Sequence, residues 1–303
     1  MAGGMLGRFK RVIARALSYM NDTQALSDAN VTLSERSLGM QAQWFDLQID
    51  TWRREELLSS RYSDSRSLAR FEHRFYSQDG SDGILREIFR RIGEGSRYFV
   101  EFGIGNGLEN NTALLVAQGW RGLWIEADSA FAGAAAKTFE GPVAAGRLAI
   151  LQQFVTAENI ESLFEDAGVP EDVSLISVDI DGNDYWVWKA IERWRPAVLE
   201  IEYNAWFPSD MPWVMRYNAT HTWNADTYQG ASLHSLCEIA AEKGYTLVAC
   251  TLAGINAIFV RDDLVDEQFV GPFSATECYQ PPRYFLVWER GGQVRAYGPS
   301  ADD

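Results

Sequence analysis

The sequence has few cysteines and few basic residues, and each shortage excludes a class of protein. Its 303 residues include only three cysteines, Cys237, Cys250 and Cys278, far apart and without a CxxC pair. This excludes a disulfide framework and a zinc cage, and it suits a reducing cytoplasm. Lysine and arginine number 27 against 42 aspartate and glutamate residues, for a net charge of −15. A surface that follows phosphates needs a basic balance, so nucleic acid is not expected as the main partner.

Long apolar runs are also missing. No stretch approaches the roughly 20 apolar residues that span a membrane. Segment 5–20 has apolar residues at helical spacing, but arginines interrupt it too often for a secretory signal. Such a helix either packs on its own protein or a second copy, or lies on anionic lipid as a peripheral contact. We expect a cytoplasmic protein, a homo-oligomer, with an N-terminal helical extension over 1–75.

From residue 76 onward, strand-like and helix-like patterns alternate. The expected strands are 98–102, 122–126, 148–152, 175–180, 197–203, 245–250 and 256–261, and the expected helices are 80–93, 109–118, 129–139, 160–167, 185–191 and 231–243. Continuous apolar strands alternating with helices are typical of a parallel sheet covered on both faces. We therefore predict an α/β, Rossmann-like, mostly parallel seven-stranded sheet in a domain over 76–303. An aromatic-rich insert is expected at about 204–228, and a terminal hairpin is expected to turn at Gly291-Gly292.

The segment FVEFGIGNGLENNT, residues 99–112, puts a glycine loop after the first of these strands. Gly103, Gly105 and Gly107 occupy alternate positions. In open α/β sheets, ligands bind beyond the carboxyl ends of the strands, and glycine lets a ligand touch bare backbone. Leu108 stands where a dinucleotide fingerprint, GxGxxG, has its last glycine. The loop is therefore a weak match to a pyrophosphate-binding loop.

Two carboxylates narrow the choice of ligand. Glu126 ends the next strand, where a carboxylate can accept both hydroxyls of a ribose, and Glu101 can face an ammonium group. S-adenosylmethionine has a ribose and an amino acid end but no phosphate. Asn111 and Ala127 are expected beside such a ligand, because polar loop residues and the residue after Glu126 adjoin it. The alternative is a plain strand-to-helix turn with Glu126 as a surface acid.

With these residues in place, the sequence resembles the class I S-adenosylmethionine-dependent methyltransferases. More narrowly, it resembles the bacterial FkbM-like group, which is associated with O-methylation of sugars and polyketide hydroxyls. The matching segments are YSQDGSDGIL (76–85), FVEFGIGNG (99–107), GLWIEAD (122–128), LISVDIDGNDYWVWKAI (175–191) and PAVLEIEYN (196–204). The resemblance spans roughly 76–261. It implies that Gln78 approaches the cofactor from the preceding loop.

Acidic and amide residues follow two later strands. Asp179, Glu202 and Asn204 would converge over the carboxyl edge if these two strands are neighbours. Hard oxygen donors suit Mg²⁺ or Ca²⁺, which binds a substrate diol and lowers a hydroxyl pKa. The resemblance supports this, because some sugar O-methyltransferases hold an ion at these two strand ends. Alternatively, the acids bind substrate hydroxyls directly, or Asp184 caps the next helix while Asp179 bonds to backbone amides.

Methyl transfer to oxygen also needs a base and in-line geometry. Asp181 is the first candidate, with Asp179 nearby, and His221 is the second because its ordinary pKa suits the task. Asp179 and Asp181 alternate along a strand end, so they point to opposite sides unless the chain bends at Gly182.

The aromatic insert is predicted to cover the substrate. Trp206, Trp213 and Trp223 lie within it, and aromatic faces stack well on sugar rings. A loop of this length is usually functional, and Tyr203 and His234 beside it are expected to contact substrate as well. The alternative is a small satellite core or a dimer contact.

These observations predict an S-adenosylmethionine-dependent O-methyltransferase that acts on a hydroxyl of a sugar or glycoconjugate, with a divalent metal such as Mg²⁺ assisting. One alternative is an NAD-dependent oxidoreductase or epimerase. Leu108 counts against it. The one Tyr-x-x-x-Lys segment in the sequence runs from Tyr185 to Lys189, and it lies in a helix placed beside VDIDGND, which also counts against this alternative. Another is a non-catalytic binding or assembly module on the same fold, which uses residues 1–75 to oligomerise.

Overall fold

The computed structural model describes residues 36–287, except 38–39, 42, 46 and 272. Its contacts divide the chain into two compact units, Met1–Ser59 and Ser60–Asp303. In the first unit, the described residues between 36 and 56 are helical. Segment 5–20 and the predicted hairpin turn at 291–292 lie outside the described residues. Within the part of the chain that is described, no helix combines the length and the apolar character that crossing a bilayer requires.

The second unit begins at Ser60, within the segment 1–75 that the sequence analysis assigned to the extension. The first residues of this unit are hydrogen-bonded to residues between 252 and 279, which follow the sheet strand β6 or lie later in the chain. The Arg61 guanidinium donates to the carbonyl oxygens of Glu277 and Tyr279 at 2.6 and 2.8 Å. The amide nitrogen of Leu252 donates to the Glu72 carboxylate at 2.7 Å.

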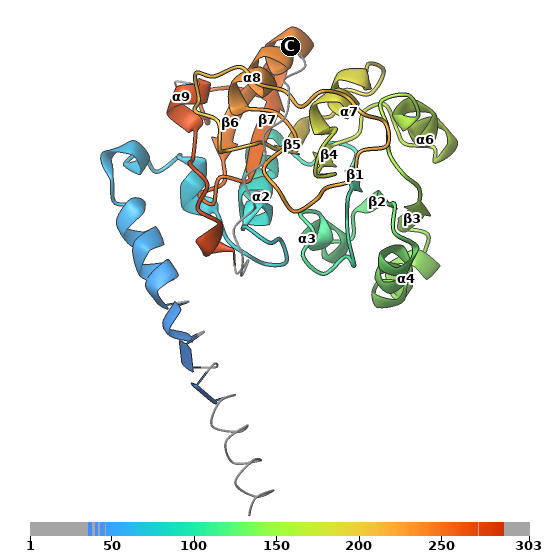
Figure 1. The fold of residues 1–303 in the computed structure, drawn as a ribbon, viewed down its shortest axis with the longest axis horizontal. Coiled ribbons are helices and arrows are strands. Elements are labelled where there is room, and N and C mark those ends of the chain that lie inside the picture. The colour runs from blue at the N-terminus through green and yellow to red at the C-terminus, as the bar shows by residue number, and fades with distance from the viewer. Residues whose placement is uncertain (1–35, 38–39, 42, 46, 272, 288–303) are drawn as a thin grey trace, which may run out of the picture. The chain divides into compact units, whose positions relative to one another are not determined.

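One seven-stranded sheet forms the centre of this unit, in the order β3-β2-β1-β4-β5-β7-β6 (Figure 1). Its strands are β1 (Tyr98–Phe102), β2 (Arg121–Glu126), β3 (Leu148–Gln152), β4 (Leu175–Val178), β5 (Val198–Glu202), β6 (Tyr245–Cys250) and β7 (Asn256–Arg261). The first five strands pair in parallel, and β7 lies antiparallel between β5 and β6. The predicted fold class is confirmed. The strand order reverses between β1 and β4, which is where such sheets bind ligands.

Helices cover both faces of this sheet (Figure 1). They are α2 (Ser81–Ile92), α3 (Ala113–Ala117), α4 (Ser129–Thr138), α5 (Glu140–Ala144), α6 (Ile160–Asp166), α7 (Asp184–Ala190), α8 (Leu233–Lys243) and α9 (Ala275–Cys278), with short 3₁₀ turns at Ser60–Tyr62, Leu68–Phe71, Asp262–Leu264 and Tyr284–Leu286. Residues of α2, α3 and α4 form one buried core against the sheet, and residues of α6, α7 and α8 form the other. Burial on both faces explains why the strands read as continuous apolar runs.

Most of the elements differ from their predicted bounds by one or two residues, and three differences have a clear physical setting. The predicted helix 109–118 shortens to α3, because the Glu101 carboxylate accepts the amide hydrogens of Asn111 and Thr112 and holds them in the preceding loop. The predicted strand 175–180 ends at Val178, before a turn. The predicted helix 129–139 ends at Thr138 and α5 follows, since Pro142 has no N–H with which to continue the ladder.

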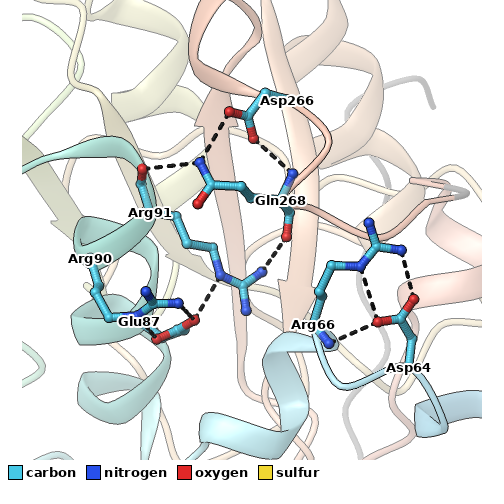
Figure 2. A network of polar contacts seen from close by, with 7 residues as sticks. All are labelled: Asp64, Arg66, Glu87, Arg90, Arg91, Asp266 and Gln268. Carbon is cyan, nitrogen blue, oxygen red and sulfur yellow. Dashed lines mark hydrogen bonds and ion pairs between the residues drawn. The ribbon is translucent and has the colours of Figure 1, made fainter.

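A polar network fixes α2 to the chain after β7 (Figure 2). The Arg91 side chain is only 3% exposed. It donates to the Glu87 carboxylate at 2.8 Å and to the Gln268 carbonyl oxygen at 2.8 Å (Figure 2). Gln268 in turn donates to the Arg91 carbonyl oxygen and to Asp266. The network thus fixes the C-terminal end of α2.

Candidate functional site

Two cavities of about 290 Å³ each open at the carboxyl edge of the sheet, where the strand order reverses. They share Gly103, Gly105, Phe131 and Asp179. The first, here the Glu126 cavity, is also lined by Glu126, Ala127, Phe154, Asp181, His221 and Trp223. The second, here the Glu101 cavity, is also lined by Gln78, Glu101, Glu109, Asn110, Asn111 and Asn256. The joined cavities bring together most of the predicted cofactor residues.

The three glycines of the loop have different roles. Gly103 has a φ of +82°, and a Cβ there would lie 1.5 Å from the Asp179 carbonyl oxygen, so no other residue fits. Gly105, with φ +51°, has open space around it and lines both cavities. Gly107 lines neither cavity. A Cβ there would lie 3.2–3.3 Å from the side chains of Trp124, Ala135 and Phe139. Glycine at position 107 therefore lets the loop pack closely against these side chains.

Glu126 is held with its carboxylate at the cavity wall. One carboxylate oxygen accepts the Gly105 amide hydrogen at 2.7 Å, and the other accepts that of Asp128 at 2.8 Å. The side chain is 8% exposed. Each oxygen keeps a lone pair, so the group can accept two further hydrogen bonds from a diol in the cavity.

Glu101 lies 4% exposed at the wall of the second cavity. Its carboxylate accepts the amide hydrogens of Asn111 at 3.0 Å and Thr112 at 3.2 Å, and the Thr112 hydroxyl at 2.5 Å. Burial raises the pKa of this carboxyl above its ordinary value. The Asn111 amide is itself fixed between the hydroxyls of Ser81 and Ser177. Glu101 thus both closes the loop and faces the ligand space.

Three acids converge beside the shared wall. Carboxylate oxygens of Asp179, Asp181 and Glu202 all lie within 4.8 Å of one another. The chain bends at Asp181 itself, which has φ +53°, and not at Gly182 as the sequence pattern suggested. Asp184 holds this bend, because its carboxylate accepts the amide hydrogens of Ile180 and Gly182 at 2.8 Å each. The bend turns two alternating acids toward one point.

The charge of this cluster is unfavourable without a cation. Burial, followed by the neighbouring carboxyls of Asp181, Asp184 and Glu101, raises the pKa of Asp179 well above its ordinary value. A bound cation would favour the ionised form, and oxygen donors are those that Mg²⁺ and Ca²⁺ prefer. The residues therefore fit a hard divalent ion.

The side chain of Asn204 is hydrogen-bonded within the insert, and its predicted contact with a metal remains a prediction. Its side-chain nitrogen donates to the carbonyl oxygens of Thr227 and Gln229 at 2.8 and 3.0 Å, and its side-chain oxygen accepts the Trp206 amide hydrogen at 3.2 Å. These bonds close the base of the insert. The structure thus brings Asp181 to the predicted pair of Asp179 and Glu202, while the Asn204 amide holds the insert.

His221 reaches the site from the insert. It lines the Glu126 cavity and packs on Gly182, where a Cβ would lie 2.3 Å from the imidazole Cδ2. Its Nε2 is buried and has no hydrogen-bond partner within the described part of the chain. The glycine thus makes room for an imidazole next to Asp181.

Of the predicted substrate-binding side chains, Trp223 alone lines either cavity. Its indole N–H donates to the Asp226 carbonyl oxygen at 2.8 Å, which fixes the ring. Trp213 is buried and stacks on Phe207 with ring centroids 4.3 Å apart, and Trp206 contacts Tyr284. Each of these two rings packs against another aromatic ring, and a substrate contact for either remains a prediction.

Tyr203 and His234 also lie away from both cavities. The Tyr203 side chain is buried and donates to the Gln280 carbonyl oxygen at 2.6 Å. His234 lies on α8, 3.6 Å from the Glu238 carboxylate. Their described contacts are structural, and a substrate contact for either remains a prediction.

Asn256, which the sequence analysis missed, lines the Glu101 cavity. It begins β7 and pairs with Glu202, the last residue of β5. Because β7 is antiparallel, its first residue lies at the edge where the parallel strands end. The pattern of a strand does not give its direction in the sheet, so the sequence carried no signal that would place Asn256 at this edge.

Glu200 is a buried acid beneath the site, with no exposed surface. It accepts the Ser177 hydroxyl at 3.3 Å, and its other oxygen has no partner within the described residues. Burial, and next the neighbouring Asp79, raise the pKa of this carboxyl well above its ordinary 4.5. The folded protein therefore keeps the Glu200 proton at pH values where the unfolded chain has lost it.

Glu200→Gln is expected to become more stabilising as pH rises. Since the folded pKa lies above the unfolded one, wild-type stability falls with pH from about 4.5 up to the folded value, and the amide removes that loss. Denaturant unfolding from pH 4 to pH 8 measures the difference, with the exposed Glu192→Gln as control. A stability difference that does not change with pH would show that Glu200 ionises normally.

Comparisons with known proteins give fold-level likeness only. Neither a family model nor a curated protein matches the sequence. Among solved structures, the chain is similar to a proposed O-methyltransferase from Klebsiella pneumoniae, with 16% identity, 74% of this chain and 99% of that chain covered, and a TM-score of 0.44.

Two further solved structures resemble the chain. A proposed caffeoyl-CoA O-methyltransferase from Staphylococcus aureus has 12% identity, coverage of 60% of this chain and 82% of that chain, and a TM-score of 0.41. A SAM dependent methyltransferase from Aquifex aeolicus has 10% identity, coverage of 71% and 96%, and a TM-score of 0.36. At such low identities and TM-scores, we base no functional conclusion on them.

Proposed function

We propose that the protein is an S-adenosylmethionine-dependent O-methyltransferase acting on a hydroxyl of a sugar or glycoconjugate. The observation that carries this proposal is the pair of joined cavities at the strand-order reversal. One has the Glu126 carboxylate fixed for a diol, and the other is lined by acids and amides. This matches the ribose and the amino acid end of the methyl donor. The resemblance to the FkbM-like group supports the same reading.

The lining also argues against the dinucleotide alternative. No lysine or arginine lines either cavity within the described residues. A pyrophosphate would face Glu101, Glu126 and Asp179 with no cationic side chain to balance its charge. By contrast, the carboxylates would attract an adenosine that carries a cationic tail, and this attraction favours its binding.

When bound, S-adenosylmethionine supplies an electrophilic methyl group. Glu126 would accept the two ribose hydroxyls, and Gly103 and Gly105 would let the donor lie against bare backbone. Glu101, Asn111 and Gln78, which line the same cavity, would meet the amino acid end. Ala127 and Phe154 adjoin Glu126 and would border the adenine. Gly107 supports the loop from behind.

Asp179, Asp181 and Glu202 would hold a divalent ion such as Mg²⁺. The ion would supply charge that lowers the pKa of an acceptor hydroxyl. The acids would fix a diol by their oxygens, and Asp181 or His221 would take the hydroxyl proton. Both candidate bases line the Glu126 cavity next to the shared wall, so either can face an acceptor that lies over Asp179. Trp223 would cover the mouth of the cavity.

Methyl transfer to a panel of neutral glycans and glycosides tests the proposal. We expect turnover with S-adenosylmethionine, with loss of activity in EDTA and recovery with Mg²⁺. Donor binding without turnover on any hydroxylated acceptor would favour a non-catalytic module. Reduction of NAD would favour the oxidoreductase. Homo-oligomerisation, peripheral membrane contact through residues 5–20 and a cytoplasmic location remain predictions.

Glu126→Ala is expected to weaken binding of S-adenosylhomocysteine more than tenfold. A buried hydrogen-bond pair to a charged carboxylate contributes about 1.5–3 kcal/mol. Isothermal titration calorimetry measures the change. Glu192→Ala is the control, because it removes an exposed acid that lines neither cavity. Equal affinities for wild type and Glu126→Ala would remove Glu126 from the site.

A further inference from the structure

The side-chain oxygen of Asn256 is an unused acceptor at the wall of the Glu101 cavity. The residue is 3% exposed and lines that cavity. Its Oδ1 has no hydrogen-bond partner within the described part of the chain. Native proteins rarely leave a buried polar atom unpaired, and such an atom next to a cavity indicates a missing ligand donor.

Asp79 fixes the direction of this amide. The Asn256 Nδ2 donates to one Asp79 oxygen at 3.2 Å, and the other Asp79 oxygen accepts the Ser81 amide hydrogen at 3.0 Å. Asp79 is 1% exposed, so this bond is shielded from water. Because the nitrogen is engaged by Asp79, the oxygen is the atom left for the cavity.

The turn that carries Asn256 is also rigid. The Asn256 amide nitrogen donates to the Thr251 hydroxyl at 3.1 Å, and the Thr251 amide nitrogen donates to the Asn256 carbonyl oxygen at 2.9 Å. Thr251 is completely buried. These bonds hold the backbone of Asn256 in place beside the cavity.

The charge of the cavity selects the kind of donor. Glu101, Glu109 and Asp179 line it together with several side-chain amides, and no basic residue does so within the described residues. A cationic group with several N–H donors satisfies both the carboxylates and the amide oxygen. Gly103 and Gly105 join this cavity to the Glu126 cavity. The cationic group therefore belongs to a ligand whose ribose lies at Glu126.

We infer that Asn256, oriented by Asp79, binds the ammonium group of the methyl donor from the wall formed by β7. This assignment rests on the proposed function. It makes Asn256 a determinant of specificity for the amino acid end, in addition to the adenosine contacts.

The test compares S-adenosylhomocysteine with its deaminated analogue, in which hydrogen replaces the amino group. By calorimetry, wild type is expected to prefer the amine by about tenfold or more, the range for a hydrogen bond to a charged group. Asn256→Leu, close in size, is expected to lower that preference about tenfold, since the contact with Glu101 is then the one that is left. Asn256→Asp is expected to keep it, since a carboxylate still accepts from an ammonium. Binding of 5′-methylthioadenosine, which lacks the amino acid end, is expected to be equal in all three proteins.

The outcomes separate this inference from the proposed function. An unchanged preference for the amine in Asn256→Leu overturns the inference alone. A change in Mg²⁺ affinity without a change in that preference also overturns it and points to a metal ligand. Failure of wild type to bind S-adenosylhomocysteine or methylthioadenosine overturns the proposed function and the inference with it. If thermal unfolding shows that Asn256→Leu is not folded, Asn256→Ala gives the same readout.

Discussion

Gly103→Ala is expected to abolish methyl donor binding. An added Cβ would lie 1.5 Å from the Asp179 carbonyl oxygen, so the ends of β1 and β4 must separate. Both groups are backbone, and neither can rotate away. Relieving such an overlap costs about 3 kcal/mol or more, which corresponds to a loss of affinity of roughly 100-fold or greater. Titration with S-adenosylhomocysteine measures the affinity, and thermal unfolding shows whether the variant is folded.

Gly119→Ala is the matched control for this substitution. Gly119 also has a positive φ, +84°, but a Cβ there would meet nothing within 4 Å, and the residue lines neither cavity. It bears only the left-handed backbone cost, about 1–2 kcal/mol. If both variants bind the donor equally, close approach of the two strand ends is not what shapes the cavity.

Asp179→Ala is expected to abolish methyl transfer while donor affinity stays close to wild type. Asp179 lies at the wall shared by both cavities and within the acidic cluster, whereas the ribose contact depends on Glu126. Loss of the group that holds the ion or the acceptor is expected to lower kcat about 100-fold or more. Single-turnover methylation at saturating donor measures the rate, and calorimetry measures donor binding.

Asp172→Ala serves as the control, since it removes an exposed acid that precedes β4, whereas Asp179 follows the other end of that strand. It is expected to transfer methyl groups at the wild-type rate. Asp179→Ala with near-normal turnover would remove Asp179 from the chemistry. Parallel loss of donor binding and turnover in Asp179→Ala would place it instead in the donor site.

The parts of the fold that were predicted are those that repeat a local pattern. β1, β3, β6 and β7 match their predicted bounds, because a strand buried on both faces is a continuous apolar run. The start of α3 was not predictable from helical pattern alone, because a carboxylate of β1 holds the residues before it. Contacts between distant residues decide such boundaries.

The residues of the candidate site also divide into those that local sequence predicts and those that depend on the three-dimensional fold. Glu126 and Gly103 follow from strand ends and backbone geometry, both of which are local. The convergence of Asp181 with Asp179 depends on a positive φ at a non-glycine residue, which the sequence does not announce. The role of Asn256 depends on an antiparallel strand inserted between β5 and β6.

In the aromatic insert, composition does not show which tryptophan rings line a cavity. Trp206, Trp213 and Trp223 are alike in sequence, yet one lines a cavity and two pack against other rings. Which ring lines the cavity depends on contacts within the insert, such as the hydrogen bond of the Trp223 indole to the Asp226 carbonyl oxygen. Residue type alone could not distinguish them.

Calorimetric titration of the wild-type chain with S-adenosylhomocysteine, with and without Mg²⁺, tests the central claim most directly. We predict one site per chain with micromolar affinity, because the ribose and ammonium contacts are both pre-positioned. NAD is predicted not to compete. No heat of binding with S-adenosylhomocysteine, together with a titration by NAD, would contradict the account and return Glu126 and Asp179 to structural roles.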